Sequence, residues 1–70
     1  MDRIAVRSSN IRSVGYDAGA GTLEVEFTSG SVYQYSDVPQ SEYEGLMNTG
    51  SKGRYFNRNI KECYRYVQVK

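Results

Sequence analysis

Hydrophobic and polar residues alternate most clearly in the first half of the chain, and this pattern predicts antiparallel strands. Residues 22–27 read Thr-Leu-Glu-Val-Glu-Phe, a period of two that is typical of a strand with one buried face. Weaker alternation over residues 11–17 and 31–36 predicts a strand on either side of it. Glycine-containing segments at 17–21 and 28–30 separate these strands, and we expect them to form hairpin loops.

The second hairpin can pair in two registers, and they place its tyrosines on opposite faces of the sheet. A two-residue turn would put Tyr33 and Tyr35 beside the glutamates of the preceding strand. A three-residue loop with Gly30 in the left-handed conformation shifts the register by one and turns both tyrosines toward the core. We favour the second register, because the first would place Gln34 opposite Val25 in the core.

The pattern changes to helical spacing after residue 36. We expect a first helix that begins with Pro39 at its first position and ends at 48–50, and a shorter second helix capped by Ser51. The residues expected to face the sheet are Tyr43, Leu46 and Met47 in the first helix and Phe56 and Ile60 in the second.

Residues 64–69 alternate again, so they form either a fourth strand at a sheet edge or an ordered tail. The predicted fold class is therefore α+β, with a three- or four-stranded antiparallel meander packed by two short helices on one face. Seventy residues make one domain, which we expect to span 1–70 with residues 1–7 and 65–70 as candidates for flexible ends.

Several kinds of catalytic and metal site are incompatible with the composition. The chain has no histidine and one cysteine, so histidine-dependent nucleophilic sites, histidine-based zinc sites and internal disulfides are excluded. The carboxylate pairs Glu24/Glu26 and Glu42/Glu44 are expected to be solvated surface groups rather than acid–base catalysts. We therefore expect no enzyme activity, no cofactor and no metal.

The cellular compartment follows from the same composition. Cys63 is expected to be a reduced, partly buried thiol, as in cytosolic proteins. The chain has no basic and apolar leader segment, and no apolar stretch approaches the ~20 residues that span a membrane. We expect a cytoplasmic protein without a membrane partner.

The charge is distributed unevenly along the chain and indicates a candidate binding surface. Residues 1–50 carry three basic and seven acidic residues, whereas residues 51–70 carry six basic residues and one acidic residue. In the second helix a basic face and the free N–H groups of the first turn suit a phosphate, and a neighbouring aromatic ring could stack on a base. The candidate nucleic-acid-binding residues are Lys52, Arg54, Arg58 and Lys61, with Tyr55 as the stacking residue.

Two other functions of the same residues remain open. The basic face can be a solvated surface that maintains solubility, or it can dock an acidic protein partner. Residues 64–69 can also pair edge to edge with another chain, which would give a weak homodimer in place of a monomer.

Several segments in order resemble the KTSC domain family, which is named for its occurrence at the C-terminus of some lysyl-tRNA synthetases. They are Asn10–Asp17, Leu23–Phe27, Gly30, Tyr33-Gln34-Tyr35, Val38-Pro39, Ser51–Asn57 and Ile60, so the resemblance covers residues 8–64. The family also occurs as small stand-alone bacterial or phage-related proteins and has no established activity. Its attachment to a synthetase implies RNA or tRNA as a partner.

Overall fold

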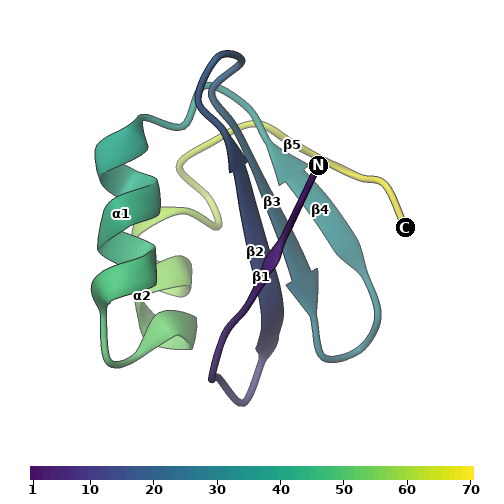
Figure 1. Ribbon diagram of the computed structural model, residues 1–70, viewed down its shortest axis with the longest axis vertical. Coiled ribbons are helices and arrows are strands. Elements are labelled where there is room, and N and C mark those ends of the chain that lie inside the picture. Colours follow the sequence, from purple (N-terminus) through teal and green to yellow (C-terminus); the bar gives the residue numbers. More distant parts are fainter.

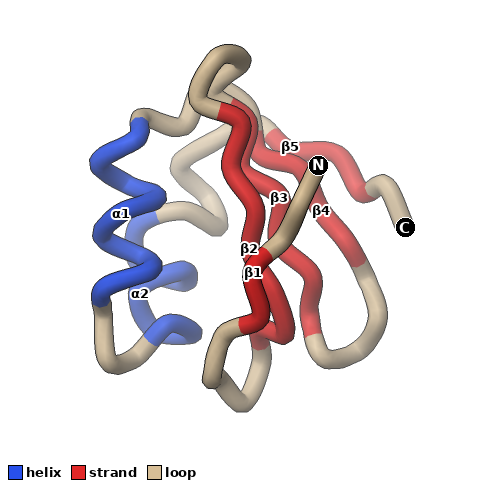
Figure 2. The backbone as a smooth tube through the Cα atoms, in the orientation of Figure 1, coloured by secondary structure: helices blue, strands red, loops and turns tan.

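The computed structural model describes residues 1–70 as a five-stranded antiparallel sheet with two helices on one of its faces (Figures 1 and 2). The elements in chain order are β1 (Ile4–Ala5), β2 (Ile11–Asp17), β3 (Thr22–Phe27), β4 (Val32–Tyr35), α1 (Gln40–Asn48), α2 (Lys52–Asn59) and β5 (Tyr66–Gln68). The strands lie in sequence order across the sheet, and the two helices connect β4 to its neighbour β5. No helix is long and apolar enough to cross a membrane.

The α+β class and the two helices on one face are confirmed, but the sheet has five strands rather than three or four. The segment 64–69 supplies the edge strand β5, which pairs with β4. The strand that the sequence pattern did not predict is β1, which pairs through only two residues, Ile4 with Val14 and Ala5 with Ser13. A strand this short has no alternation to detect. Both ends of the chain thus lie at opposite edges of the sheet.

The favoured register of the β3–β4 hairpin is confirmed. Gly30 has a φ of 99°, and its N–H donates to the carbonyl of Phe27 to close a three-residue loop. Tyr33 then lies opposite Val25, and Tyr35 lies opposite Leu23. The tyrosines therefore share the helix-facing side of the sheet with the apolar residues of β3.

The core lies between this side of the sheet and the two helices. Its sheet residues include Val14, Leu23, Val25 and Tyr35, and the helical layer contributes Leu46, Phe56 and Ile60, all at most 4% exposed. Tyr43 and Met47 pack at the edge of this cluster, so the predicted apolar positions of both helices are confirmed. Pro39 is the N-cap residue rather than the first helical residue, and its carbonyl accepts the N–H of Glu42.

The outer face of the sheet carries a polar network where the sequence predicted solvated carboxylates. Glu24 is only 6% exposed, and its carboxylate accepts hydrogen bonds from Gln34 (2.7 Å) and from the Arg3 guanidinium. Gly15 lies opposite Glu24, and the space left by its missing side chain is occupied by the main chain of Asp2 and the side chain of Arg3. The expectation for Glu24 was therefore wrong, because residues that precede β1 cover it.

These bonds lower the pKa of Glu24. The largest cause is the hydrogen bond from Gln34, reinforced by Arg3, and together they outweigh the effect of burial, which acts in the opposite direction. Glu26 continues the network, since its carboxylate accepts a hydrogen bond from Ser13 (2.8 Å) and lies within 4.0 Å of Arg12.

We expect the folded state to lose the contribution of Glu24 in acid. Its pKa is lower in the folded than in the unfolded chain, so the stabilisation is complete above the ordinary value of 4.5 and disappears as the pH falls through the folded value. Glu24→Gln should lower the free energy of unfolding by about 1–3 kcal/mol at neutral pH, because the hydrogen bonds to a charged group are lost. It should also flatten the acid dependence of the free energy of unfolding, measured by chemical denaturation.

Glu62→Gln is the matched control, since Glu62 is exposed and makes no hydrogen bond or ion pair. It should leave both the free energy of unfolding at neutral pH and its acid dependence unchanged. Equal acid dependence in wild type and Glu24→Gln would contradict the assigned role of Glu24.

Candidate functional site

The basic face predicted on α2 forms one wall of a polar depression, which we call the basic hollow. It has a volume of about 510 Å³ and lies between α2 and the turn that connects β1 to β2. Its lining contains no apolar residue and no carboxylate: Arg7, Ser8, Ser9, Asn10, Gly50, Ser51, Lys52, Gly53, Arg54, Asn57 and Arg58. The hollow therefore offers hydrogen-bond donors and positive charge with no competing acid.

Arg54 and Arg58 are exposed and project from successive turns of α2, as their spacing predicted. Sequence reasoning missed Arg7, which the β1–β2 turn brings to the same hollow. The turn is fixed locally by Ser8, whose hydroxyl accepts the N–H groups of Asn10 (3.2 Å) and Ile11 (3.3 Å). Nothing in the sequence indicated that the turn lies against α2.

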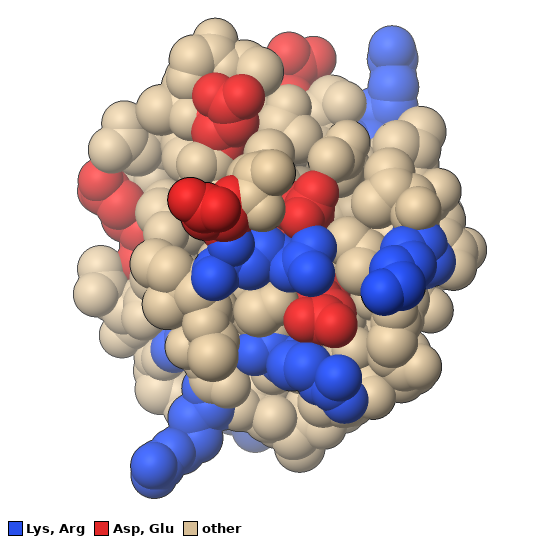
Figure 3. All heavy atoms as spheres, turned by 45° about the vertical axis from the view of Figure 1, so that its right-hand side comes forward, with Lys and Arg blue, Asp and Glu red and all other residues tan.

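The arginines of the hollow have no carboxylate partner. All three ion pairs of the structure join Arg3 or Arg12 to Glu24 or Glu26 on the outer face of the sheet. Figure 3 shows basic and acidic side chains lying against one another near the centre of that side. Two of the carboxylates in residues 1–50 thus form ion pairs with arginines of the same segment. The positive charges of α2 have no ion-pair partner.

Lys52 lines the hollow, but its ammonium group is used within the fold. Its Nζ donates to the carbonyl oxygens of Met47 (3.2 Å) and Thr49 (3.0 Å) at the C-terminal end of α1. A cation there satisfies carbonyls that have no partner in the helix and complements the helix dipole. Of the predicted phosphate contacts, Lys52 is therefore the one whose charged group already bonds to the main chain of the protein.

Tyr55 lies between the two helices. Its hydroxyl donates to Glu42 (2.6 Å), and its ring covers Gly45 of α1, where a side chain would overlap the phenol. Tyr64 donates to the other carboxylate oxygen of Glu42 (3.0 Å). The bond to Glu42 is the largest cause that raises the pKa of Tyr55 to about 12. Stacking by Tyr55 stays a prediction; Tyr55 lines a third, smaller depression of about 240 Å³ together with Arg54 and Arg58.

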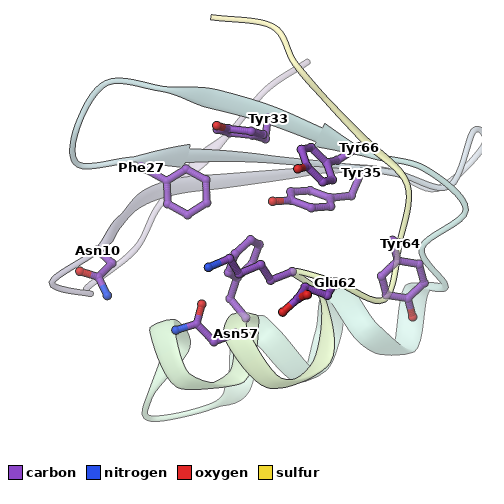
Figure 4. Close-up of a pocket in the computed structure, with 10 residues that line it drawn as sticks. Asn10, Phe27, Tyr33, Tyr35, Asn57, Glu62, Tyr64 and Tyr66 are labelled. Carbon is purple, nitrogen blue, oxygen red and sulfur yellow. The ribbon is translucent and has the colours of Figure 1, made fainter.

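Lys61 is separated from the arginines and belongs to a second depression, which we call the aromatic groove. The groove has a volume of about 830 Å³ and lies between β4 and β5 on one side and the end of α2 on the other (Figure 4). Its lining is Asn10, Phe27, Tyr33, Tyr35, Phe56, Asn57, Lys61, Glu62, Tyr64 and Tyr66. Asn10 and Asn57 also line the basic hollow, so the two depressions share a wall.

Cys63 follows α2 and is exposed rather than partly buried. Ile60 is the last buried residue of this segment, and the three residues that follow it are exposed. The thiol takes part in neither depression.

Comparison with known proteins found one family and several close relatives. The KTSC domain matches residues 7–66. An uncharacterized protein of Stutzerimonas stutzeri is 44% identical over 70 residues, which is 99% of both chains. A KTSC domain protein from Yersinia pestis, solved as a crystal structure, is 36% identical, with a TM-score of 0.96 over 99% of this chain and 97% of that one.

A lysine–tRNA ligase of Nostoc punctiforme is 44% identical over 61 residues. The match covers 87% of this chain but only 11% of the ligase. A second ligase, from Trichormus variabilis, matches with the same identity and coverage. The chain is therefore similar to a small part of these ligases. This similarity does not extend to the activity of the whole ligase.

We expect the bond between Tyr55 and Glu42 to stabilise the packing of α2 on α1. Tyr55→Phe removes only the hydroxyl and should lower the free energy of unfolding by about 1–2 kcal/mol, since a hydrogen bond to a charged group is lost. Tyr43→Phe is the matched control, because the hydroxyl of Tyr43 bonds to no protein group. Chemical denaturation measures the free energy of unfolding of both variants. An equal decrease in the two would contradict this role of the Tyr55 hydroxyl.

Proposed function

The chain belongs to the KTSC domain family, and we propose that it is a small, non-enzymatic module that binds RNA weakly through the sugar–phosphate backbone. The family relatives include chains of the same length and a region of lysine–tRNA ligases. The proposed site is the basic hollow, with Arg54 and Arg58 as the main phosphate contacts and Lys61 as a contact at the adjoining groove.

The observation that carries the proposal is the unneutralised charge of the basic hollow. Arg7, Arg54 and Arg58 converge on one concave, wholly polar surface, and no carboxylate lies within ion-pair distance of any of them. A guanidinium group binds phosphate oxygens with two parallel hydrogen bonds, so three of them suit a chain of phosphates. A surface that served solubility alone would not require these arginines to lie together in one depression.

The first turn of α2 adds donors to this surface. Ser51 holds the N-cap position, as predicted, but its hydroxyl makes no capping hydrogen bond. The first N–H groups of a helix have no intrahelical partner, and their partial positive charge favours an anion. The N–H of Ser51 donates to the Thr49 hydroxyl (3.2 Å), so the groups left for an anion are those of Lys52 and Gly53, which line the hollow.

The affinity should be low because few phosphates are engaged. Each phosphate neutralised on a single strand contributes roughly −0.7 to the slope of log K against log salt. Three arginines therefore give a slope of about −2. A net charge of +1 for the whole chain adds little further attraction. Weak binding suits a module that increases the affinity of a larger assembly, and a lysine–tRNA ligase, named for a reaction on tRNA, is one such context.

A second candidate function rests on the edge strand β5. Tyr66, Val67 and Val69 are large apolar residues that are 53%, 58% and 49% exposed, and β5 has a neighbour on one side only. An unpaired edge of this kind can add a strand from a second copy or from another protein. An acidic partner could also dock at the basic hollow through the same arginines.

We expect short single-stranded RNA and tRNA to perturb the NMR signals of residues 51–61 and of the 7–10 turn at about 50 mM salt. The perturbations should shrink at about 200 mM salt. Arg54→Ala/Arg58→Ala should reduce the affinity about tenfold or more, because two of the three arginines of the hollow are removed. Arg65→Ala/Lys70→Ala removes the same charge outside the hollow and is the matched control.

Equal loss in the two double variants would show attraction by net charge alone and would contradict a site at the hollow. No perturbation by RNA at the lower salt would refute RNA binding. In that case analytical ultracentrifugation over a range of concentrations tests the second candidate, with Val67→Lys expected to abolish any dimer formed through β5.

A further inference from the structure

The aromatic groove is the largest depression of the molecule, and its open ring surfaces come from the sheet. Tyr35 and Phe56 form its floor and are only 3% and 4% exposed. Tyr66 is 53% exposed, and its ring centroid lies 5.5 Å from that of Tyr35 and 5.6 Å from that of Tyr33 (Figure 4). The exposed ring of Tyr66 is thus held in place by two further tyrosines of the sheet.

The wall opposite the sheet is partly polar: Asn57 of α2 lies there, and Asn10 lies at the end of the groove away from Tyr64 (Figure 4). The side-chain amides of Asn10 and Asn57 make no hydrogen bond within the chain. Lys61 makes no ion pair, and neither does the groove's single carboxylate, Glu62. An amide offers both donors and acceptors, so this wall can match a flat molecule with a mixed polar edge.

An apolar peptide side chain is a poor match for this groove. It would cover the amides of Asn10 and Asn57 without replacing their bonds to water, which is unfavourable. A nucleobase has an apolar π-face for Tyr66 and a polar edge for the two asparagines. The asparagines also line the basic hollow, so a strand whose phosphates lie there passes the mouth of the groove.

We propose that the aromatic groove receives one unpaired nucleobase of the strand whose backbone lies in the basic hollow. The base stacks on Tyr66, and the amides of Asn10 and Asn57 bond to its edge. This inference rests on the proposed function, since the same strand must occupy the hollow. It assigns the recognition of the base to Tyr66, Asn10 and Asn57, none of which is a candidate residue predicted from the sequence, and Lys61 lines the same groove.

The test compares two strands that differ only in their bases. A short oligouridylate and an abasic ribose–phosphate strand of the same length carry the same phosphates, so backbone binding alone gives them equal affinity. We expect the oligouridylate to bind at least about fivefold more tightly, as one stacked base contributes on this scale. Fluorescence anisotropy at about 50 mM salt measures both affinities.

Variants locate the effect in the groove. Tyr66→Ala and, separately, Asn57→Ala should bring the ratio of the two affinities close to one. Asn57 is exposed on α2 and alanine favours a helix, so this variant keeps the fold even if Tyr66→Ala weakens β5. Val67→Ala is the matched control: Val67 is the next residue of β5 and does not line the groove.

A base analogue gives a direct readout of stacking. An oligonucleotide with 2-aminopurine in place of one base should lose fluorescence on binding to wild type and keep it on binding to Tyr66→Ala. Equal affinity of the abasic and base-bearing strands would overturn the base site and leave backbone binding intact. Binding of neither strand would overturn both proposals.

Discussion

The left-handed conformation of Gly30 determines which side chains lie on each face of the sheet. Its φ of 99° allows a three-residue loop, and this loop sets Tyr33 opposite Val25 and Tyr35 opposite Leu23. A shift by one residue would move every side chain of β4 to the other face. The glutamates of β3 would then meet the tyrosines, the core would lose Tyr35, and the aromatic groove would lose Tyr33 and Tyr35.

This register also governs where the charges are neutralised. With the tyrosines on the helix side, Glu24 and Glu26 lie together on the outer face, where Arg3 reaches them over the gap left by Gly15. The ion pairs of the molecule are therefore confined to that face. The cations of α2 lie across the core from these carboxylates, which is why a chain of nearly zero net charge can present a wholly basic hollow.

The helical layer is held by a carboxylate that bridges two tyrosines. Glu42 accepts hydrogen bonds from Tyr55 of α2 and from Tyr64 of the segment that leads to β5. One residue of α1 thus ties together the element that carries Arg54 and Arg58 and the segment that closes one end of the aromatic groove. The relative position of the two depressions depends on this bridge, because Asn57 between them belongs to α2.

The local pattern of the sequence determined every element except β1, and also the inner faces of these elements. Alternation in 22–27 and helical spacing at Phe56 and Ile60 are properties of consecutive residues, and the structure confirms them. The candidate site was predicted only in part for the same reason: Arg54 and Arg58 share a helix face whatever the rest of the chain does. The tertiary structure alone brought Arg7 to them, turned the ammonium of Lys52 to α1 and separated Lys61 into the groove. These outcomes depend on contacts between residues far apart in the chain, and a local pattern contains no information about such contacts.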